Sequence, residues 1–265
     1  MKQGIGFDNP HLFEMLAGAE QALARKGYGL IMKHTDAKEL SRHPENVLSE
    51  EYVDGAILHA SVVSKEVAHI LENTDLPYIV VGMPSFQNQL CWIDTDNSVA
   101  GKIAATHLME CGCRKIAFIG SRKEDMISSH RLNGVLEAIG REMPNEYLCE
   151  GEPTREGGEL AIKKLLKLET PPDAVICANQ YIAFGSVSEL KKQGICIPED
   201  MAVITFDDFP FSRALNPQLT VVNLDMYEIG SEAAKITLRR IRKPQLVVQS
   251  QTTLPLLIER RSTIK

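Results

Sequence analysis

The chain has 265 residues, and 44% of them are hydrophobic, which is enough to bury the core of one large globular unit or of two lobes. Its 29 Lys and Arg against 35 Asp and Glu give a formal net charge of −6, whereas nucleic-acid-binding domains usually carry a basic excess. These values exclude a disordered chain and make these residues alone a poor DNA-binding module.

The cysteines and the amino-terminal residues indicate in which cellular compartment the protein is expected. The six cysteines occur without a CxxC pair, and most lie in apolar runs, so we expect free buried thiols rather than a zinc site or a disulfide framework. The first residues, MKQGIGFDNP, contain no apolar stretch of signal-peptide length. No run approaches the roughly 20 apolar residues that cross a bilayer. We therefore expect a cytoplasmic protein.

In the first part of the chain, short aliphatic runs alternate with segments in which apolar residues recur at helical spacing, as in parallel α/β sheets. A first strand has only residues 1–7 available, and these include polar Lys2 and Gln3. Further strands are predicted at residues 29–33, 55–58 and 78–81, and helices at residues 12–23 and 100–108. Residues 87–94 show no helical stripe and are interpreted as a loop or an edge strand.

The pattern starts again after Cys113. Strands are predicted at residues 115–119, 174–178 and 202–206, with a helix at residues 183–190. The tail from Thr220 contains a strand-like TVVNL, a helix around Ile229 to Ile236 and a final run LPLLIE. Two successive series of about a hundred residues each predict two α/β lobes.

Motifs for catalysis are missing from the pattern. The segment GIGFDNP has only two glycines and no adequate strand before it, so it is a weak dinucleotide loop. The seven histidines are dispersed, and neither GxSxG nor HExxH occurs. We expect no enzyme, no cofactor and no metal site, although catalytic groups that converge only in three dimensions stay open.

Polar residues directly follow several of the predicted strands. They are Asp36, His59, Ser61, Asn179, Gln180, Asp207 and Asp208. Any single one is more typical of a turn or a helix cap than of a ligand contact. Together they lie at the carboxyl edge of the strands, where open α/β sheets bind ligands. Carboxylates and amides there can bond vicinal hydroxyls, and Arg131 can bond a ring oxygen or a carboxylate.

Several segments resemble the lactose/galactose repressor (LacI) family of transcriptional regulators. They are, in chain order, VDGAIL, LPYIVVG, DTDNSVAGKIAATHLMECGCRKIAFIGS, RLNGVLEAIG, PDAVICANQ, GICIPEDMAVITFDDFPFSRALNPQLTVV and ERRST. The likeness extends from Asp8 to Thr263. It implies a two-lobed fold like that of type I periplasmic binding proteins, with three crossovers. The implied lobes are residues 1–109 plus 222–244 and residues 110–221 plus 245–265.

The resemblance also implies a small effector in a cleft between the lobes. Arg131 matches the family arginine that reaches the ligand, Asp207 an aspartate that takes ligand hydroxyls, Asn179 a cleft asparagine and Asp96 an acidic contact of the first lobe. Phe7 and Phe13 resemble the apolar wall under the ligand, and Met226 is implied near the same cleft. At Arg131 and Asp207, which lie at a strand edge rather than in a core run, we expect alanine to weaken effector binding without disturbing the fold.

The implied partners follow from the same likeness. A homodimer is implied, with DNA bound through a helix-turn-helix headpiece absent from these residues. Where some sugar-binding members place a stacking aromatic the chain has Pro153, and it has Gln180 where Asp is usual, so a sugar, a sugar phosphate, a polyol or a purine stays open as effector. A secreted or periplasmic sugar-binding protein of a transport system is the alternative with the same fold.

Overall fold

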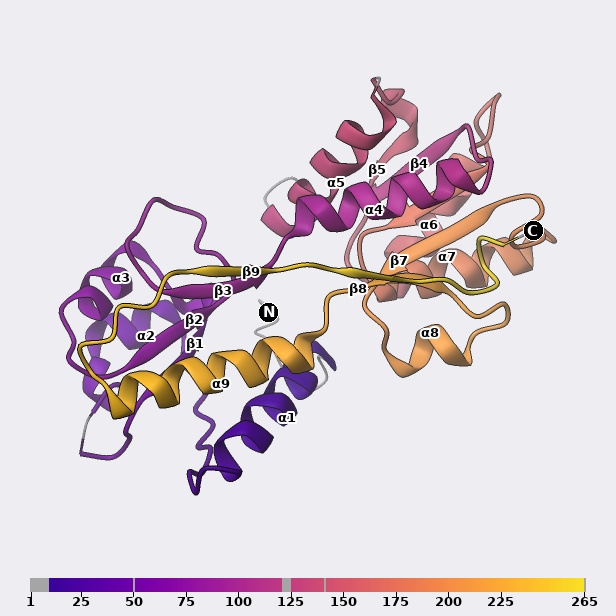
Figure 1. Cartoon of the computed structure of the whole chain (residues 1–265). Coiled ribbons are helices and arrows are strands. Elements are labelled where there is room, and N and C mark those ends of the chain that lie inside the picture. The colour runs from indigo at the N-terminus through magenta and orange to yellow at the C-terminus, as the bar shows by residue number, and fades with distance from the viewer. Residues whose placement is uncertain (1–9, 50, 121–124, 141, 265) are drawn as a thin grey trace. The chain divides into compact units, whose positions relative to one another are not determined.

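The chain folds into two compact units (Figure 1), which are described separately below. A computed structural model describes residues 10–49, 51–120, 125–140 and 142–264. The first unit runs to Thr95 and includes Asp225–Thr253, and the second comprises Asp96–Leu224 and the residues from Leu254 onward. The chain therefore passes between the units three times.

The described residues of the first unit form a four-stranded parallel sheet. Its strands, in spatial order, are β1 (Ala56–His59), β2 (Tyr78–Val81), β3 (Trp92–Thr95) and β9 (Gln251–Thr253). The helices are α1 (Pro10–Ala24), α2 (Ala37–Arg42), α3 (Lys65–Glu72) and α9 (Met226–Arg242), with short 3-10 turns at Pro44–Asn46 and Ala60–Val62. Every residue of β2 is buried, as expected of a β-branched run covered on both faces.

Two apolar layers hold this sheet. On one face, Ile79 and Val81 pack with Met15 of α1 and Ile229 of α9. On the other face, Val80 packs with residues of α2 and α3, including Leu40, Val67 and Leu71. The apolar residues of α3 recur at helical spacing, and its first turn is capped by Ser64, whose Oγ accepts the Val67 N–H at 3.3 Å.

The second unit is built on a six-stranded sheet in the order β10-β8-β7-β6-β4-β5. The strands are β4 (Ile116–Gly120), β5 (Leu148–Glu150), β6 (Ala174–Cys177), β7 (Ala202–Phe206), β8 (Thr220–Asn223) and β10 (Leu256–Ile258). All neighbours are parallel except β10, which runs antiparallel to β8. The carboxyl ends of β4, β6 and β7 therefore meet at one edge.

Helix pairs cover this sheet. The helices are α4 (Asn97–Glu110), α5 (Met126–Ile139), α6 (Arg155–Leu165), α7 (Gln180–Lys192) and the short α8 (Pro210–Ala214), with a 3-10 turn at Asn145–Tyr147. Figure 1 shows α4 with α5 on one face of the sheet and α6 with α7 on the other.

The interior of this sheet is dry enough to suppress ionisation of a thiol. On β6, burial raises the pKa of the Cys177 thiol to about 12.

Glycines set the distance between α4 and α5. A Cβ atom at Gly101 would lie 1.9 Å from the Arg131 carbonyl oxygen, and one at Gly134 would lie 1.8 Å from that of Ser98. Each helix thus presents a glycine to the backbone of the other, at a separation that no side chain fits. The α1–α9 and α6–α7 pairs repeat this arrangement through Gly18, Gly230, Gly158 and Gly185.

The carboxyl-terminal segment of the described chain is anchored by buried hydroxyls. Ser262 and Thr263 are both fully buried. The Thr263 Oγ1 lies 2.7 Å from the Thr220 Oγ1 of β8 and 2.8 Å from the Nε2 of His107, which is buried on α4. Burial lowers the pKa of His107, so the neutral imidazole is favoured there.

The predicted strand at residues 29–33 is not found. These residues form no strand, and Ile31 is 75% exposed. An aliphatic run becomes a strand only beside a partner strand, and none of the described strands pairs with this segment. The predicted strand at residues 1–7 lies outside the described residues. The segment 87–94, interpreted as a loop or an edge strand, contributes residues 92–94 to the inner strand β3.

The division into units differs from the expected one at all three crossings. The chain leaves the first unit after Thr95, returns at Asp225 and leaves again after Thr253. Residues 96–109 were assigned to the first lobe, but α4 packs against α5, β7 and β8 of the second unit. The apolar stripe of α4 shows that the helix covers a sheet without indicating which sheet.

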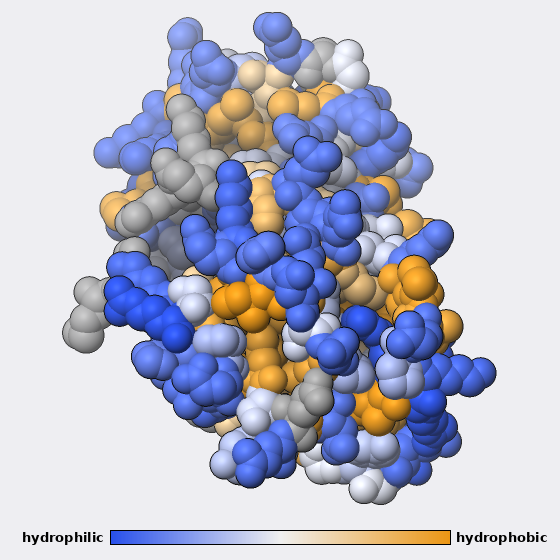
Figure 2. Space-filling view, turned by 90° about the vertical axis from the view of Figure 1, so that its left-hand side faces the viewer, coloured by the Kyte–Doolittle hydropathy of each residue, from blue (hydrophilic) through white to orange (hydrophobic). Residues whose placement is uncertain are grey.

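The surface is largely hydrophilic on the face drawn in Figure 2, with apolar patches between the charged side chains. Ile31, Tyr52 and Val247 are among the strongly exposed apolar side chains. Within the described ranges, no helix has the length and apolar character needed to span a membrane.

The glycine contact between α4 and α5 predicts that Gly134→Ala is destabilising. The methyl group would meet the Ser98 carbonyl oxygen at 1.8 Å, so the two helix backbones have to separate. Overpacking of this kind costs about 1–3 kcal/mol, which urea unfolding measures. Gly29→Ala is the matched control, because nothing lies within 4 Å of its added Cβ. Equal stability of the two variants would contradict the packing argument.

Candidate functional site

Four of the predicted ligand residues belong to the second unit. Asp96 and Asn179 directly precede α4 and α7, Arg131 lies in α5, and Asp207 directly follows β7. Asn179 and Asp207 follow neighbouring parallel strands, and the Arg131 guanidinium reaches the end of the same strands. The structure thus brings Arg131, Asn179 and Asp207 to the carboxyl edge of one sheet.

The Arg131 guanidinium is buried and fixed in position. Its Nε donates to Asn97 Oδ1 at 2.9 Å, and its Nη1 donates to the Ala178 carbonyl at 2.5 Å. The guanidinium also stacks 4.2 Å from the centroid of the Phe206 ring. Only 4% of Arg131 is exposed. The side chain therefore connects the start of α4 with the ends of β6 and β7.

Asp96 and Asn179 both cap helices. Asp96 Oδ1 accepts the Val99 N–H at 2.9 Å, and Asn179 Oδ1 accepts the Ile182 N–H at 3.0 Å. Each bond satisfies a backbone donor of the first turn and orients the side chain. Asn97, the first residue of α4, then lies within reach of Arg131. A capping bond uses one side-chain oxygen, so the Nδ2 donors of Asn179 keep their bonding capacity.

Asp207 is held in a left-handed backbone conformation with φ of 69°. Non-glycine residues seldom adopt this conformation, which costs of order 1 kcal/mol, although Asp tolerates it better than most. Backbone bonds secure the turn, because its N–H donates to the Val222 carbonyl at 2.9 Å and its carbonyl accepts the Gln180 Nε2 at 2.8 Å. Asp207 is 2% exposed, so the turn is buried.

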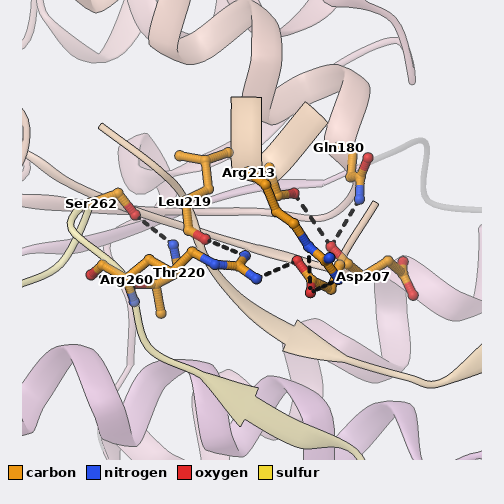
Figure 3. Close-up of polar contacts among 9 residues, drawn as sticks. Gln180, Asp207, Arg213, Leu219, Thr220, Arg260 and Ser262 are labelled. Carbon is orange, nitrogen blue, oxygen red and sulfur yellow. Dashed lines mark hydrogen bonds and ion pairs between the residues drawn. The ribbon is translucent and has the colours of Figure 1, made fainter. Parts of the chain in front are cut away.

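The next residue, Asp208, is held by two arginines, Arg213 and Arg260, whose side chains are labelled in Figure 3. Its Oδ1 lies 2.6 Å from Arg260 Nη2, and its Oδ2 lies 2.7 Å from Arg213 Nη2. Arg260 also donates from Nη1 to the Leu219 carbonyl at 2.9 Å. Arg260 of the carboxyl-terminal segment thus stabilises the turn that contains Asp207.

The predicted residues of the first unit are less constrained. Phe13 on α1 is 52% exposed, whereas Met226 at the start of α9 packs partly buried against the Ile79 layer. Phe7 lies outside the described residues. Among the polar residues that follow strands, Asp36 caps α2, and His59 Nδ1 lies 2.8 Å from Ser61 Oγ. The roles of Phe13 and Met226 toward an effector stay predictions.

Two residues that position this edge, Asn97 and Arg260, are missing from the predictions made from the sequence, and Gln180 is predicted only as one of the polar residues at the strand ends. Asn97 orients Arg131, Gln180 bonds the Asp207 main chain, and Arg260 neutralises Asp208. The adjacency of Asn97 to Asp96 and of Gln180 to Asn179 was a usable signal. Nothing in the sequence pairs Arg260 with a residue 52 positions earlier.

A separate groove of about 650 Å³ lies at the amino end of β4. It is lined by Met109, Cys113, Arg114, Lys115, Ile116, Ile139, Glu142, Met143, Pro144 and Tyr147. None of the predicted ligand residues lines it, and the fixed polar groups converge on the opposite edge of the sheet. Among the described residues, no group of three or more His, Cys, Asp or Glu is placed to hold a metal ion.

The model of the periplasmic binding protein-like domain family matches residues 105–263, which is more than half of the chain. The HTH-type transcriptional repressor PurR of Actinobacillus pleuropneumoniae is 28% identical over 96% of this chain and 77% of its own length. The chain belongs to this family as the effector-binding core of a LacI-family transcriptional regulator. The predicted family, fold class and two parallel sheets are thereby confirmed.

Two further relatives of this LacI-family core concern ribose. The ribose operon repressor of Haemophilus influenzae is 29% identical over 89% of this chain and 72% of its own length. A LacI family regulator of Enterococcus faecalis, solved with bound ribose, is 26% identical, covers 98% of this chain and 96% of its own, and has a TM-score of 0.84. These relatives are transcriptional regulators, so the transport-protein alternative is not supported.

We predict that substitutions of the two arginines that bond Asp208 lower the stability of this LacI-family core unequally. Arg260→Leu leaves a carboxylate that is 8% exposed without its buried partner, so we expect urea unfolding to show a loss of about 3–5 kcal/mol. Arg213→Leu is the matched control, because Arg213 is 64% exposed and pairs of that kind contribute about 0–1 kcal/mol. Equal losses would disprove the assigned roles.

Proposed function

We propose that the carboxyl edge of the second unit binds a small polyhydroxylated effector that controls DNA binding by the regulator. The observation that supports this most is the Arg131 guanidinium, which Asn97, Ala178 and the Phe206 ring fix beside the Asp207 turn. A buried arginine and a buried aspartate at one sheet edge supply donors and acceptors in fixed positions.

The chemistry of these groups fits hydroxyls. A hydroxyl both donates and accepts, so adjacent hydroxyls can accept from Arg131 or Asn179 while they donate to Asp207 or Asp96. Because the Arg131 side chain is already ordered by its own bonds and the Asp207 backbone is fixed in its turn, little conformational entropy is lost when the effector binds. We propose ligand contacts for these four residues on that basis.

Within this class we favour a pentose. Sugar phosphates, polyols and purines also carry the necessary hydroxyl or N–H groups, and they belong in the test. One relative is a ribose operon repressor and another was solved with bound ribose, which supports D-ribose as the first probe. The fixed guanidinium is suited to donate hydrogen bonds to the oxygens of a sugar.

We propose that DNA binding is controlled through the coupling of effector binding to operator binding. We place DNA binding in a helix-turn-helix headpiece outside these residues and the regulator in the cytoplasm, since the relatives are transcriptional repressors. An effector changes operator affinity only as far as its own affinity differs between two states of the protein, typically by about 1–3 kcal/mol. The two headpieces of a homodimer would be the elements that respond.

Effector binding is tested with a conservative variant, because alanine at these buried positions is expected to disturb the fold as well as the binding. Arg131 is almost fully buried and hydrogen-bonded through its side chain, and Asp207 is almost fully buried in a left-handed turn that Asp tolerates better than Ala, so removal of either side chain also affects stability. Asp207→Asn keeps the size and the turn tendency of the side chain. It replaces one acceptor oxygen with a donor and removes the charge.

We expect wild-type protein to be stabilised by at least one member of a panel of D-ribose, ribose 5-phosphate, ribitol and hypoxanthine in a thermal-shift assay. Asp207→Asn should weaken that binding about tenfold or more in calorimetry, since a bond to a charged group contributes about 1.5–3 kcal/mol. Asp75→Asn, at an exposed aspartate of the first unit, is the control. Unchanged affinity in Asp207→Asn rejects this site.

The proposed homodimer is tested by a separate measurement of mass in solution. Sedimentation equilibrium at micromolar concentration should give twice the chain mass of 29.4 kDa. A mass of one chain under those conditions would reject the proposed dimer while leaving effector binding to be judged by the panel.

A further inference from the structure

Gln180 is buried at the start of α7, between Asn179 and the Asp207 turn. It is 9% exposed, and its Nε2 donates to the Asp207 carbonyl at 2.8 Å. In Figure 3 the side chains of Gln180 and Asp207 lie together at one end of the cluster, away from Arg260 and Ser262. Gln180 therefore belongs to the same sheet edge as the proposed effector contacts.

The oxygen of this amide has no partner among the described residues. The Oε1 of Gln180 is buried and accepts no hydrogen bond from any residue that the structure describes. The orientation of the amide is fixed, because turning it over would place Oε1 against the Asp207 carbonyl, acceptor facing acceptor. A buried acceptor without a donor costs free energy, so it indicates a group that arrives from outside the chain.

We infer that Gln180 Oε1 accepts a hydrogen bond from a hydroxyl or N–H of the effector and thereby determines specificity. This inference rests on the proposed function, since it adds a contact to that site. An acceptor at this position favours a neutral donor group and disfavours a phosphate or carboxylate oxygen, which would face it with another lone pair. The site thus selects sugars, polyols or bases over anionic groups at this point.

Three variants separate this contact from a structural role. Gln180→Met keeps the length of the side chain and removes both its donor and its acceptor. Gln180→Glu keeps an acceptor oxygen, and its neutral carboxyl group, which burial favours, can donate to the Asp207 carbonyl in place of the amide. Gln193→Met is the matched control, the same substitution at the far end of α7, where Gln193 Nε2 bonds Glu189 Oε1 at 2.7 Å. If Gln180→Met does not fold, Gln180→Leu replaces it.

Dissociation constants are measured by calorimetry for D-ribose, ribose 5-phosphate, ribitol and hypoxanthine, with ligand-free melting temperatures alongside. For the probe that wild-type protein binds most tightly, we expect Gln180→Met to weaken binding about tenfold, the equivalent of one neutral hydrogen bond. Gln180→Glu should lie closer to wild type, and Gln193→Met should equal it.

Two results would overturn the inference alone. Wild-type affinity in Gln180→Met would mean that water rather than the effector satisfies Oε1. Equal weakening in Gln180→Met and Gln180→Glu would mean that an acceptor at this position does not contribute to effector binding. If no member of the panel binds wild-type protein, the proposed function fails and the inference fails with it.

Discussion

The close approach of α4 and α5 is the constraint on which the candidate site depends. Gly101 lies against the Arg131 backbone, and Gly134 lies against the backbone of Ser98, so the two helices meet without intervening side chains. This contact brings Arg131 within reach of Asn97 at the start of α4. From there the guanidinium can extend over Phe206 to the end of β6. Bulkier residues at the glycines would move the arginine away from its partners.

The buried charge of Asp208 is balanced by one arginine that is near in sequence and one that is distant. Asp208 is neutralised by Arg260 and Arg213, and the neighbouring Asp207 keeps its left-handed turn through backbone bonds. Such a turn is strained, and it persists because bonds from several elements determine it. The stability of this edge and the proposed recognition of the effector therefore depend on neighbouring side chains, an arrangement typical of sites that are organised before the ligand arrives.

The sequence predicted the buried strands well because their residues dictate them. Residues 78–81 and 202–206 are aliphatic runs and form β2 and β7. Residues 29–33 have a similar composition but form no strand, since pairing depends on a neighbour rather than on the run itself. Arg131, Asn179 and Asp207 were predicted from family likeness. The bonds of Asn97 and Arg260 arise from helix packing and chain crossings, which no local pattern encodes.

The carboxyl-terminal anchor has a practical consequence for protein engineering. Ser262 and Thr263 are fully buried, and Ser262 Oγ donates to the Val203 carbonyl of β7 at 2.5 Å. A reporter fused after Lys265 would therefore begin only two residues beyond the buried Thr263 in the sequence. A flexible spacer directly after Lys265 would let a reporter sit outside without pulling these hydroxyls from the sheet.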